Sequence, residues 1–353
     1  MTTMLTSSSF LSAVEPDLQR VRAGLRALSN DLPESLQPLA RCGALDGGKM
    51  LRSALLLLWG RALGAVTEHH IQAGIVLELL HNATLLHDDV LDEGCLRRGV
   101  PTVNRRWGNR TAVLFGDLLL GKVLELSAVF TPEVRAALGQ MALHTCEGEI
   151  SQTARAGHFT LSEQEYLAII GQKTAALFEG ACYIGAYLAG TSTPESLAAA
   201  RFGYHIGMAY QIMDDLLDIA GGDDVLRKTP GTDLRSAKPT LPLIHALSVL
   251  PERQKTSLLL GLRSHAAGAC ELLAVFDGTG SVAYVLGRLR DYADAALDAL
   301  QDIRETLVKD ALIEVPRWIL QEAAKGAAIP DCGFRMGDSP HIAHVRSPIR
   351  NLQ

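Results

Sequence analysis

Residues 78–92 read ELLHNATLLHDDVLD, and they indicate the fold more clearly than any other part of the 353-residue chain. Leucine and alanine recur at helical spacing before three aspartates, Asp88, Asp89 and Asp92. Residues four apart share a face of a helix, so Asp88 and Asp92 project side by side and Asp89 flanks them. We therefore expect a largely apolar helix that carries an acidic cluster.

The rest of the chain supports the same fold class. Alanine- and leucine-rich segments with helical spacing fill most of its length, whereas alternating β-branched runs are scarce. Turn residues recur at intervals that suit an antiparallel bundle, for example at residues 46–48, 98–101 and 221–224. We predict one all-α domain over residues 1–328, an antiparallel helix bundle around a central active-site cavity. Residues 329–353, rich in Pro, Gly, Ser, Arg and His, are expected to form a flexible tail.

Composition excludes several classes of protein. The formal net charge is −6 and no dense Lys/Arg block is present, which argues against nucleic acid as the partner. The six cysteines form no C-x-x-C pair, so neither a zinc site nor a disulfide framework is indicated. The N-terminus lacks a signal-peptide pattern, and the longest apolar run is too short to cross a bilayer. We expect a soluble, cytoplasmic protein with no transmembrane segment.

A second acidic cluster repeats the spacing of the first. Residues 210–218 read YQIMDDLLD, with Asp214, Asp215 and Asp218 placed 126 positions (214 − 88) after the first cluster. One such motif is explained equally well by a solvated acidic helix face. Two copies in apolar sequence are better explained by Mg²⁺, which binds a few carboxylates together with water and phosphate oxygens. We predict that both clusters face one cavity and share metals around a diphosphate.

Basic residues lie in the order that a diphosphate site requires. Residues 47–52 read GGKMLR and place Lys49 and Arg52 three apart at a helix start, where backbone amides also favour a phosphate. Taken singly, such a feature is also typical of an ordinary helix start or of a solvated last turn. The further candidates are Arg97, Arg98, Lys173, Lys228 and Lys238.

In its motifs and their order the chain resembles the trans-isoprenyl diphosphate synthases, or polyprenyl synthetases. The similarity runs over residues 14–319 and rests on GGKMLR, ELLHNATLLHDDVLDEGCLRRGVPTVN, FGDLLLGKV, GQKTAALFEGA, GYHIGMAYQIMDDLLDIAG and KTPGTDLRSAKPTLPLIHAL. The resemblance implies a Mg²⁺-dependent prenyltransferase. Such an enzyme condenses isopentenyl diphosphate head to tail (1′-4) with an allylic prenyl diphosphate, giving a linear all-trans polyprenyl diphosphate. It also implies a homodimer.

The same resemblance implies roles for individual residues. Three Mg²⁺ ions on the allylic substrate would be held by Asp88, Asp92 and Asp214, together with Asp89, Asp215 and Asp218. The allylic diphosphate would be contacted by Arg97, Lys173 and Lys238, with Lys228 close by. The diphosphate of isopentenyl diphosphate would be held by Lys49, Arg52, His81 and Arg98. The side-chain oxygens next to the reacting carbons would be those of Thr174 and Gln211.

The implied chemistry suits these residue types. Metals and cations stabilise the departing diphosphate, so that the allylic C–O bond ionises and the double bond of isopentenyl diphosphate attacks the resulting cation. A proton is then lost to the diphosphate itself. No protein nucleophile is required, and the sequence offers no Ser/His/Asp or Cys/His arrangement.

Product length depends on residues just before the first cluster. In the family that the chain resembles, bulky residues four or five positions before the first aspartate close the product tunnel. Here Thr84 and Ala83 occupy these positions, and both are small. We predict a product longer than twenty carbons, although Leu80 or Leu77 could stop growth at an intermediate length. A geranylgeranyl or farnesyl diphosphate synthase is the alternative, and tight helix packing would also explain Ala83.

Three other classes of protein remain to be separated from this interpretation. A terpene cyclase needs no second diphosphate site, which the basic residues around Lys49 argue against. A non-catalytic partner subunit typically loses aspartates, whereas all six are present here. A helical interaction module would show no Mg²⁺-dependent turnover.

Overall fold

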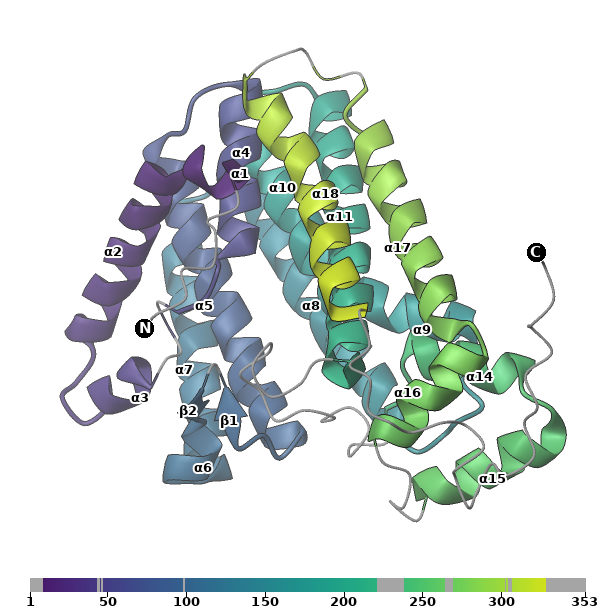
Figure 1. The fold of residues 1–353 in the computed structure, drawn as a ribbon. Helices are drawn as coiled ribbons and strands as arrows, with labels where there is room; N and C mark the ends of the chain where they lie inside the picture. Colours follow the sequence, from purple (N-terminus) through teal and green to yellow (C-terminus); the bar gives the residue numbers. More distant parts are fainter. Residues whose placement is uncertain are drawn as a thin grey trace, which may run out of the picture.

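The computed structural model describes residues 9–42, 45, 47–97, 99–220, 238–263, 269–301, 303 and 307–327. Their regular structure is almost entirely helical (Figure 1). The exception is a small antiparallel hairpin of β1 (Leu96–Arg97) and β2 (Val100–Pro101), which the sequence analysis did not predict. Gly99, at a φ of 79°, makes its tight turn possible, because glycine adopts positive φ without steric cost. The prediction of an all-α fold is confirmed.

The described residues form helices along most of their length. In chain order they are α1 (Ser9–Ser12), α2 (Glu15–Asp31), α3 (Gln37–Arg41), α4 (Leu51–Leu63), α5 (Glu68–Leu91), α6 (Val103–Trp107), α7 (Asn109–Ser127), α8 (Pro132–Ala154), α9 (Glu163–Ile170), the π-helical turn η1 (Gly171–Ala175), α10 (Ala176–Leu188), α11 (Thr193–Ala220), α14 (Leu241–Val249), α15 (Glu252–Arg263), α16 (Ala269–Gly278), α17 (Ser281–Asp298) and α18 (Leu307–Ala327).

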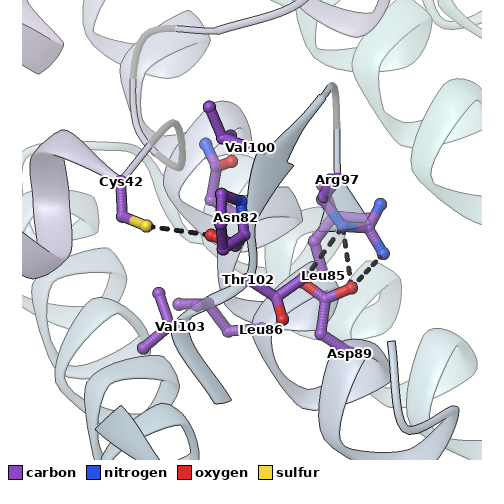
Figure 2. A pocket seen from close by; sticks show the side chains of 10 residues that line it. Cys42, Asn82, Leu85, Leu86, Asp89, Arg97, Val100, Thr102 and Val103 are labelled. Carbon is purple, nitrogen blue, oxygen red and sulfur yellow. Dashed lines mark hydrogen bonds and ion pairs between the residues drawn. The ribbon is translucent and has the colours of Figure 1, made fainter. Parts of the chain in front are cut away.

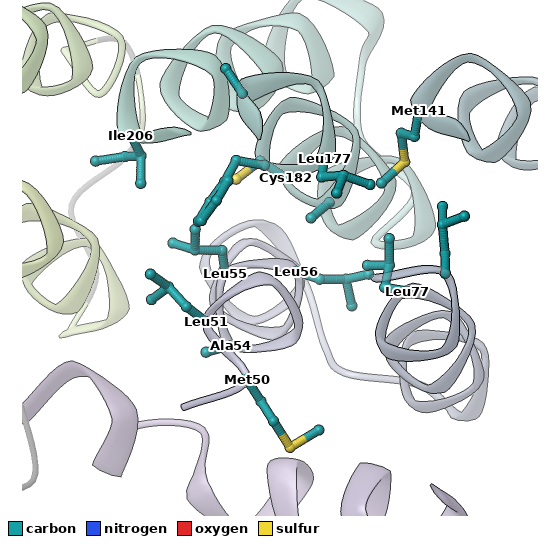
Figure 3. Close-up of a cluster of buried hydrophobic side chains, with 14 of the residues drawn as sticks. Met50, Leu51, Ala54, Leu55, Leu56, Leu77, Met141, Leu177, Cys182 and Ile206 are labelled. Atoms are coloured by element: carbon teal, nitrogen blue, oxygen red, sulfur yellow. The ribbon is translucent and has the colours of Figure 1, made fainter. Parts of the chain in front are cut away.

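The helix α4 lies at the centre of the bundle, and α10 packs against α4 on one side and against α11 on another (Figure 1). Four successive leucines of α4, residues 55–58, are wholly buried, and so is Trp59. A helix that is apolar on every side has to lie inside a protein, because no face of it suits water. Figure 3 shows Leu55 and Leu56 in one buried cluster with Leu77 of α5, Met141 of α8 and Leu177 of α10.

Small residues bring the central helices close together. A Cβ added at Gly185 of α10 would lie 2.2 Å from the Leu56 carbonyl oxygen, and one at Gly203 of α11 would lie 2.4 Å from the Phe178 carbonyl oxygen. Both distances are far below van der Waals contact, so the backbones can approach this closely only because these positions lack a side chain. The elements that carry the site residues are thereby held in a rigid frame.

Two predictions on the ends of the chain are not tested by this structure. The predicted tail, residues 329–353, lies outside the described residues, and so does the boundary at residue 328. Within the described part of the chain, no single helix is both long and apolar enough to cross a membrane, although the bent pair Glu271–Gly278 and Ser281–Asp298 meets the length and composition criteria when taken together.

Candidate active site

The first aspartate cluster ends α5. Asp88 and Asp89 lie in its last turn, and Asp92 caps it by donating its backbone N–H to the Asp88 carbonyl oxygen at 2.8 Å. Glu93 then adopts a φ of 51°, which turns the chain sharply away from the helix axis toward the β1–β2 hairpin. The cluster is therefore fixed at a helix end, with the hairpin folded back over it.

The hairpin brings Arg97 onto Asp89. The Arg97 Nε lies 2.9 Å and 3.1 Å from the two carboxylate oxygens of Asp89, and a second guanidinium nitrogen lies 2.8 Å from one of them. Figure 2 shows this pair beside a pocket that is also lined by Cys42, Asn82 and Leu86. The Asp89 side chain is 10% exposed, so its charge is balanced mainly by this arginine and little by water.

Lys238, which is distant in the sequence, contacts the same cluster. Its Nζ lies 2.6 Å from an oxygen of Asp92, and the side chains are 10% and 25% exposed respectively. The residues are 146 positions apart, and Lys238 stands just before α14. The structure thus places two of the predicted diphosphate-binding cations, Arg97 and Lys238, directly against the aspartates of the first cluster.

The third such cation, Lys173, lies in η1. It forms an ion pair with Glu149 of α8, and its Nζ donates a hydrogen bond to Gln152 Oε1 at 2.9 Å. Burial alone would lower the pKa of Lys173, but the attraction of Asp88 and Glu149 outweighs burial and raises that pKa above its ordinary value. Lys173 therefore carries a firm positive charge beside the first cluster.

Glu149 is a site residue that the sequence analysis missed. Burial, together with repulsion by Asp88, raises the pKa of Glu149 to about 7, and burial likewise raises the pKa of Asp88. The neighbouring Gly148 is the one sequence feature that could have drawn attention to Glu149. A Cβ at Gly148 would lie 2.4 Å from the Lys173 backbone nitrogen, so only glycine lets η1 approach α8 this closely. The contact itself depends on tertiary packing, so the spacing of residues in the sequence does not reveal it.

The second cluster lies on α11 and has a different environment. The two oxygens of Asp215 accept hydrogen bonds from Gln211 Nε2 and from the hydroxyl of Tyr166, each at 2.6 Å. Thr174 in turn donates to Gln211 Oε1 at 2.6 Å, so the two residues predicted to lie by the reacting carbons do contact each other. Asp214 is partly exposed and Asp218 is buried.

The predicted site for the second diphosphate lies around the start of α4. A guanidinium nitrogen of Arg52 lies 3.1 Å from His81 Nε2, and the guanidinium stacks 4.5 Å from the centre of the Phe178 ring. The Nζ of Lys49 lies 4.6 Å from the centre of the Trp318 ring. Burial is the main cause that lowers the pKa of Lys49, opposed by Glu322 and Asp214. The predicted partners Arg98 and Lys228 lie outside the described residues.

The turn η1 joins the two clusters. Its neighbouring residues Lys173 and Thr174 face different ways: Lys173 interacts with Asp88 and Asp92 of the first cluster, and Thr174 bonds to Gln211 beside the second. A π-helical turn offsets successive side chains from their α-helical positions, and such turns are frequent at functional sites. Both clusters therefore lie next to the same short turn.

The donor set fits Mg²⁺ when it is bound together with a diphosphate. Among the described residues, no three His, Cys, Asp or Glu side chains converge as a cage for one metal ion. Mg²⁺ is commonly held by only one or two carboxylates, with water and substrate phosphates completing its octahedron. The raised pKa values of Asp88 and Glu149 show that negative charge is costly here, and a bound divalent cation would remove that cost.

The predicted chain-length residues lie one helical turn before Asp88. Ala83 is wholly buried, and Thr84 is partly exposed with its hydroxyl bonded to the His81 carbonyl oxygen at 2.8 Å. Farther back on α5, Leu77 and Leu80 are buried, and a Cβ added at Gly74 would lie 3.0 Å from Val21 of α2. Gly74 therefore packs against α2.

Residues 33–273 match the polyprenyl synthetase family. An octaprenyl diphosphate synthase from Haemophilus influenzae is 32% identical over 305 residues, which are 85% of this chain and 92% of the relative. A geranylgeranyl diphosphate synthase from Methanosarcina mazei is 32% identical over 295 residues, which are 82% of this chain and 90% of the relative.

A solved structure has the same fold. The crystal structure of a polyprenyl synthase from Caulobacter crescentus, complexed with calcium and isoprenyl diphosphate, matches with a TM-score of 0.83 and 31% identity. The match covers 88% of this chain and 96% of that chain.

Proposed function

The chain belongs to the polyprenyl synthetase family and is a prenyltransferase, and from this premise we propose its specific reaction. It condenses isopentenyl diphosphate 1′-4 with an allylic prenyl diphosphate, in repeated Mg²⁺-dependent steps. The product is a linear all-trans polyprenyl diphosphate longer than twenty carbons. The observation that carries the proposal is the η1 turn, whose Lys173 faces one aspartate cluster while its Thr174 contacts the residues beside the other.

In this proposal the allylic diphosphate lies against the first cluster. Arg97, Lys173 and Lys238 are already aligned there by Asp89, Glu149 and Asp92 respectively, and they can transfer their hydrogen bonds to phosphate oxygens. Mg²⁺, held by Asp88, Asp92, Asp214 and Asp218 with Asp89 and Asp215 behind them, would supply charge neutralisation for the departing diphosphate. Three ions per site are proposed, by resemblance to the family.

The second diphosphate is proposed to bind at the start of α4. Lys49, Arg52 and His81 gather cationic and hydrogen-bonding groups there, at a place distinct from the cations of the first cluster. A cyclase or a hydrolase needs one diphosphate only, so a second basic site supports condensation. The position of Arg52 over the Phe178 ring holds its guanidinium plane in a fixed orientation, which suits bidentate phosphate binding.

The residues of the chain then act on an ionising substrate. The cations around the first cluster take up the negative charge that the leaving group acquires. The oxygens of Thr174 and Gln211 lie next to them and stabilise positive charge on the allylic carbons. Holding both substrates in register supplies much of the rate, and the proton lost at the end goes to the released diphosphate.

The proposed length rests on Ala83 and Thr84. Neither side chain is bulky, so no large residue blocks the helix face one turn before Asp88. One helical turn rises about 5.4 Å, close to the length of an isoprene unit, so an unblocked turn admits a further addition. A twenty-carbon geranylgeranyl product is the second candidate, because Leu77 and Leu80 are buried farther along the same helix.

A homodimer in the cytoplasm is proposed as the working form. Large apolar side chains are exposed on the successive helices α7 and α8, with exposures of 58% for Leu114, 74% for Leu124, 50% for Leu143 and 69% for Ile150. Exposed apolar side chains gathered on two helices support an interface with a second copy. Sedimentation of the purified protein tests this, and a monomer at micromolar concentration contradicts it.

The central experiment is a product assay. The purified protein is incubated with isopentenyl diphosphate, Mg²⁺ and one allylic primer at a time, and the dephosphorylated products are separated by chromatography. We expect products longer than twenty carbons and none in the presence of EDTA. Products that end at fifteen or twenty carbons would overturn the proposed length, and the absence of any prenyl transfer would overturn the proposed reaction.

A further inference from the structure

Four side chains form a continuous line of hydrogen bonds from α9 to η1 by way of α11. The Tyr166 hydroxyl donates to Asp215, Gln211 Nε2 donates to the other oxygen of Asp215, and the Thr174 hydroxyl donates to Gln211 Oε1. All three distances are 2.6 Å. Because α9 runs directly into η1, the line starts and ends on one helical segment and is closed through α11.

The line has a defined polarity. A carboxylate only accepts hydrogen bonds, so Asp215 requires the NH₂ end of the Gln211 amide to face it. The reversed amide would bring two oxygens together at the Asp215 contact and would turn its NH₂ group, in place of its carbonyl oxygen, toward Thr174. Asp215 therefore decides that Gln211 presents its carbonyl oxygen on the side of Thr174. An amide without such a partner is free to adopt either orientation.

Tyr166 fixes Asp215 in turn. The two residues are 3% and 4% exposed, so water competes little for their hydrogen bond. The start of α9 is held by a capping box in which Ser162 and Glu165 exchange hydrogen bonds at 2.9 Å and 3.2 Å. With α9 anchored and both Asp215 oxygens engaged, the carboxylate has little freedom to rotate.

We propose that Tyr166 and Asp215 are positioning residues for prenyl transfer: they hold the Gln211 amide so that its carbonyl oxygen, together with Thr174, faces the carbons on which positive charge develops. This inference rests on the proposed function and refines it, because Asp215 acts through Gln211 where the sequence analysis expected a metal ligand. A correctly aimed carbonyl dipole stabilises a developing cation, whereas a reversed amide would direct its N–H groups at it.

The matched test compares two tyrosines. Tyr166→Phe removes the hydroxyl that fixes Asp215. Tyr284→Phe removes a comparable hydroxyl, which bonds to Glu163 in the first turn of α9 and lies outside this line of four side chains. We expect Tyr166→Phe to lower kcat by about 10- to 50-fold. The KM of each substrate and the Mg²⁺ concentration for half-maximal activity should stay within twofold of wild type. Tyr284→Phe should leave all four quantities unchanged.

A binding measurement shows whether the substitution weakens the stabilisation of positive charge on the substrate. Two inert analogues of the allylic diphosphate are compared, one with an ammonium nitrogen at the cationic carbon and one with a neutral carbon there. We expect Tyr166→Phe to weaken the ammonium analogue about tenfold and the neutral analogue less than twofold. Equal weakening of both analogues would indicate a general loss of structure and would overturn the inference.

Asp215→Asn provides the second variant, in case Tyr166→Phe folds poorly. An asparagine no longer excludes the reversed Gln211 amide, so kcat should fall while the Mg²⁺ requirement stays at the wild-type value. A raised Mg²⁺ requirement in Asp215→Asn would show that Asp215 is a metal ligand and would refute its positioning role. Product formation by the wild-type enzyme tests the proposed function separately, because these results are ratios between variant and wild type.

Discussion

The two aspartate clusters share one sequence motif but differ in what surrounds them. In the first cluster the described partners are cations: Arg97 lies against Asp89, Lys238 against Asp92, and Lys173 acts on Asp88. In the second cluster, Asp215 is held by the uncharged donors of Tyr166 and Gln211. The same spacing of carboxylates thus meets three cations at the first cluster, whereas at the second the carboxylate of Asp215 accepts two hydrogen bonds from uncharged groups.

The difference indicates a division of work. Cations paired with carboxylates can exchange those partners for a diphosphate when a divalent cation takes their place on the carboxylates, so the first cluster is suited to bind and release an anion. Uncharged donors have no such exchange to make, and they fix geometry. We infer that the first cluster is adapted to the leaving group and that the second also orients groups near the reacting carbons.

The largest expected effect comes from removing one aspartate at each end. Asp88→Ala and Asp214→Ala should each lower prenyl transfer by about 10³-fold, because charge that develops on the leaving group would lose its nearest neutralisation. The measurement is the initial rate of isopentenyl diphosphate incorporation at saturating Mg²⁺. Turnover that is unchanged in either variant contradicts the shared site.

The free energy of unfolding should distinguish the ion pair of the first cluster from the hydrogen bonds of the second. Arg97→Ala leaves the Asp89 carboxylate, 10% exposed, without its counter-ion, and we expect a loss of about 3 kcal/mol in the free energy of unfolding. Tyr166→Phe removes one hydrogen bond from an uncharged donor to a buried carboxylate and should cost about 2 kcal/mol. Urea titration of the metal-free proteins measures both values.

A surface pair serves as the control for that comparison. Lys122 and Glu125 form an i,i+3 ion pair with side chains 38% and 63% exposed. Lys122→Ala should change the free energy of unfolding by less than about 0.5 kcal/mol. If Arg97→Ala has no larger effect than Lys122→Ala, the ionic anchoring of the first cluster contributes nothing to stability.

The pH dependence of stability should reveal Glu149. Its pKa of about 7 in the folded protein, against an ordinary 4.5, means that the folded state binds this proton more tightly than the unfolded chain. The free energy of unfolding of the metal-free protein should therefore fall as pH rises from about 4.5 to about 7. Glu149→Gln cannot ionise, so it should be more stable than wild type by about 3 kcal/mol at pH 8 and equal to it near pH 4.

Thermal or urea unfolding in EDTA at both pH values checks this prediction. Glu147→Gln is the matched control, because Glu147 is exposed on the same helix and its replacement should give no pH-dependent gain. A stability profile of Glu149→Gln that runs parallel to that of wild type would show that the folded-state pKa of Glu149 is ordinary.

A substitution at the end of the proposed product tunnel should have the smallest effect on rate and a clear effect on the length of the product. Thr84→Phe places a ring one turn before Asp88, where the native side chain is partly exposed and has room to be replaced. The product should shorten to fifteen or twenty carbons while the first condensation stays within about fivefold of wild type. Product chromatography measures this, and an unchanged product length places the floor elsewhere.

Much of the architecture could be predicted from the sequence. Helical periodicity depends on neighbours three and four positions apart, so the helices and the i,i+4 pairing of Asp88 with Asp92 follow from local spacing. Arg97, Lys173 and Lys238 could likewise be recognised as candidate diphosphate-binding residues, since each stands in a distinctive local segment of the sequence. The family was also indicated by the order of its motifs.

Only the tertiary structure decided which of these groups meet. Glu149 and Tyr166 look like ordinary helical residues in the sequence, and they become site residues because η1 packs against α8 and α9 runs into η1. The physical reason is the distance along the chain over which each effect acts. A local pattern fixes which face of a helix a side chain occupies. The environment that sets its charge and its hydrogen-bond polarity comes from residues far away in the chain, brought within contact by the packing of the bundle.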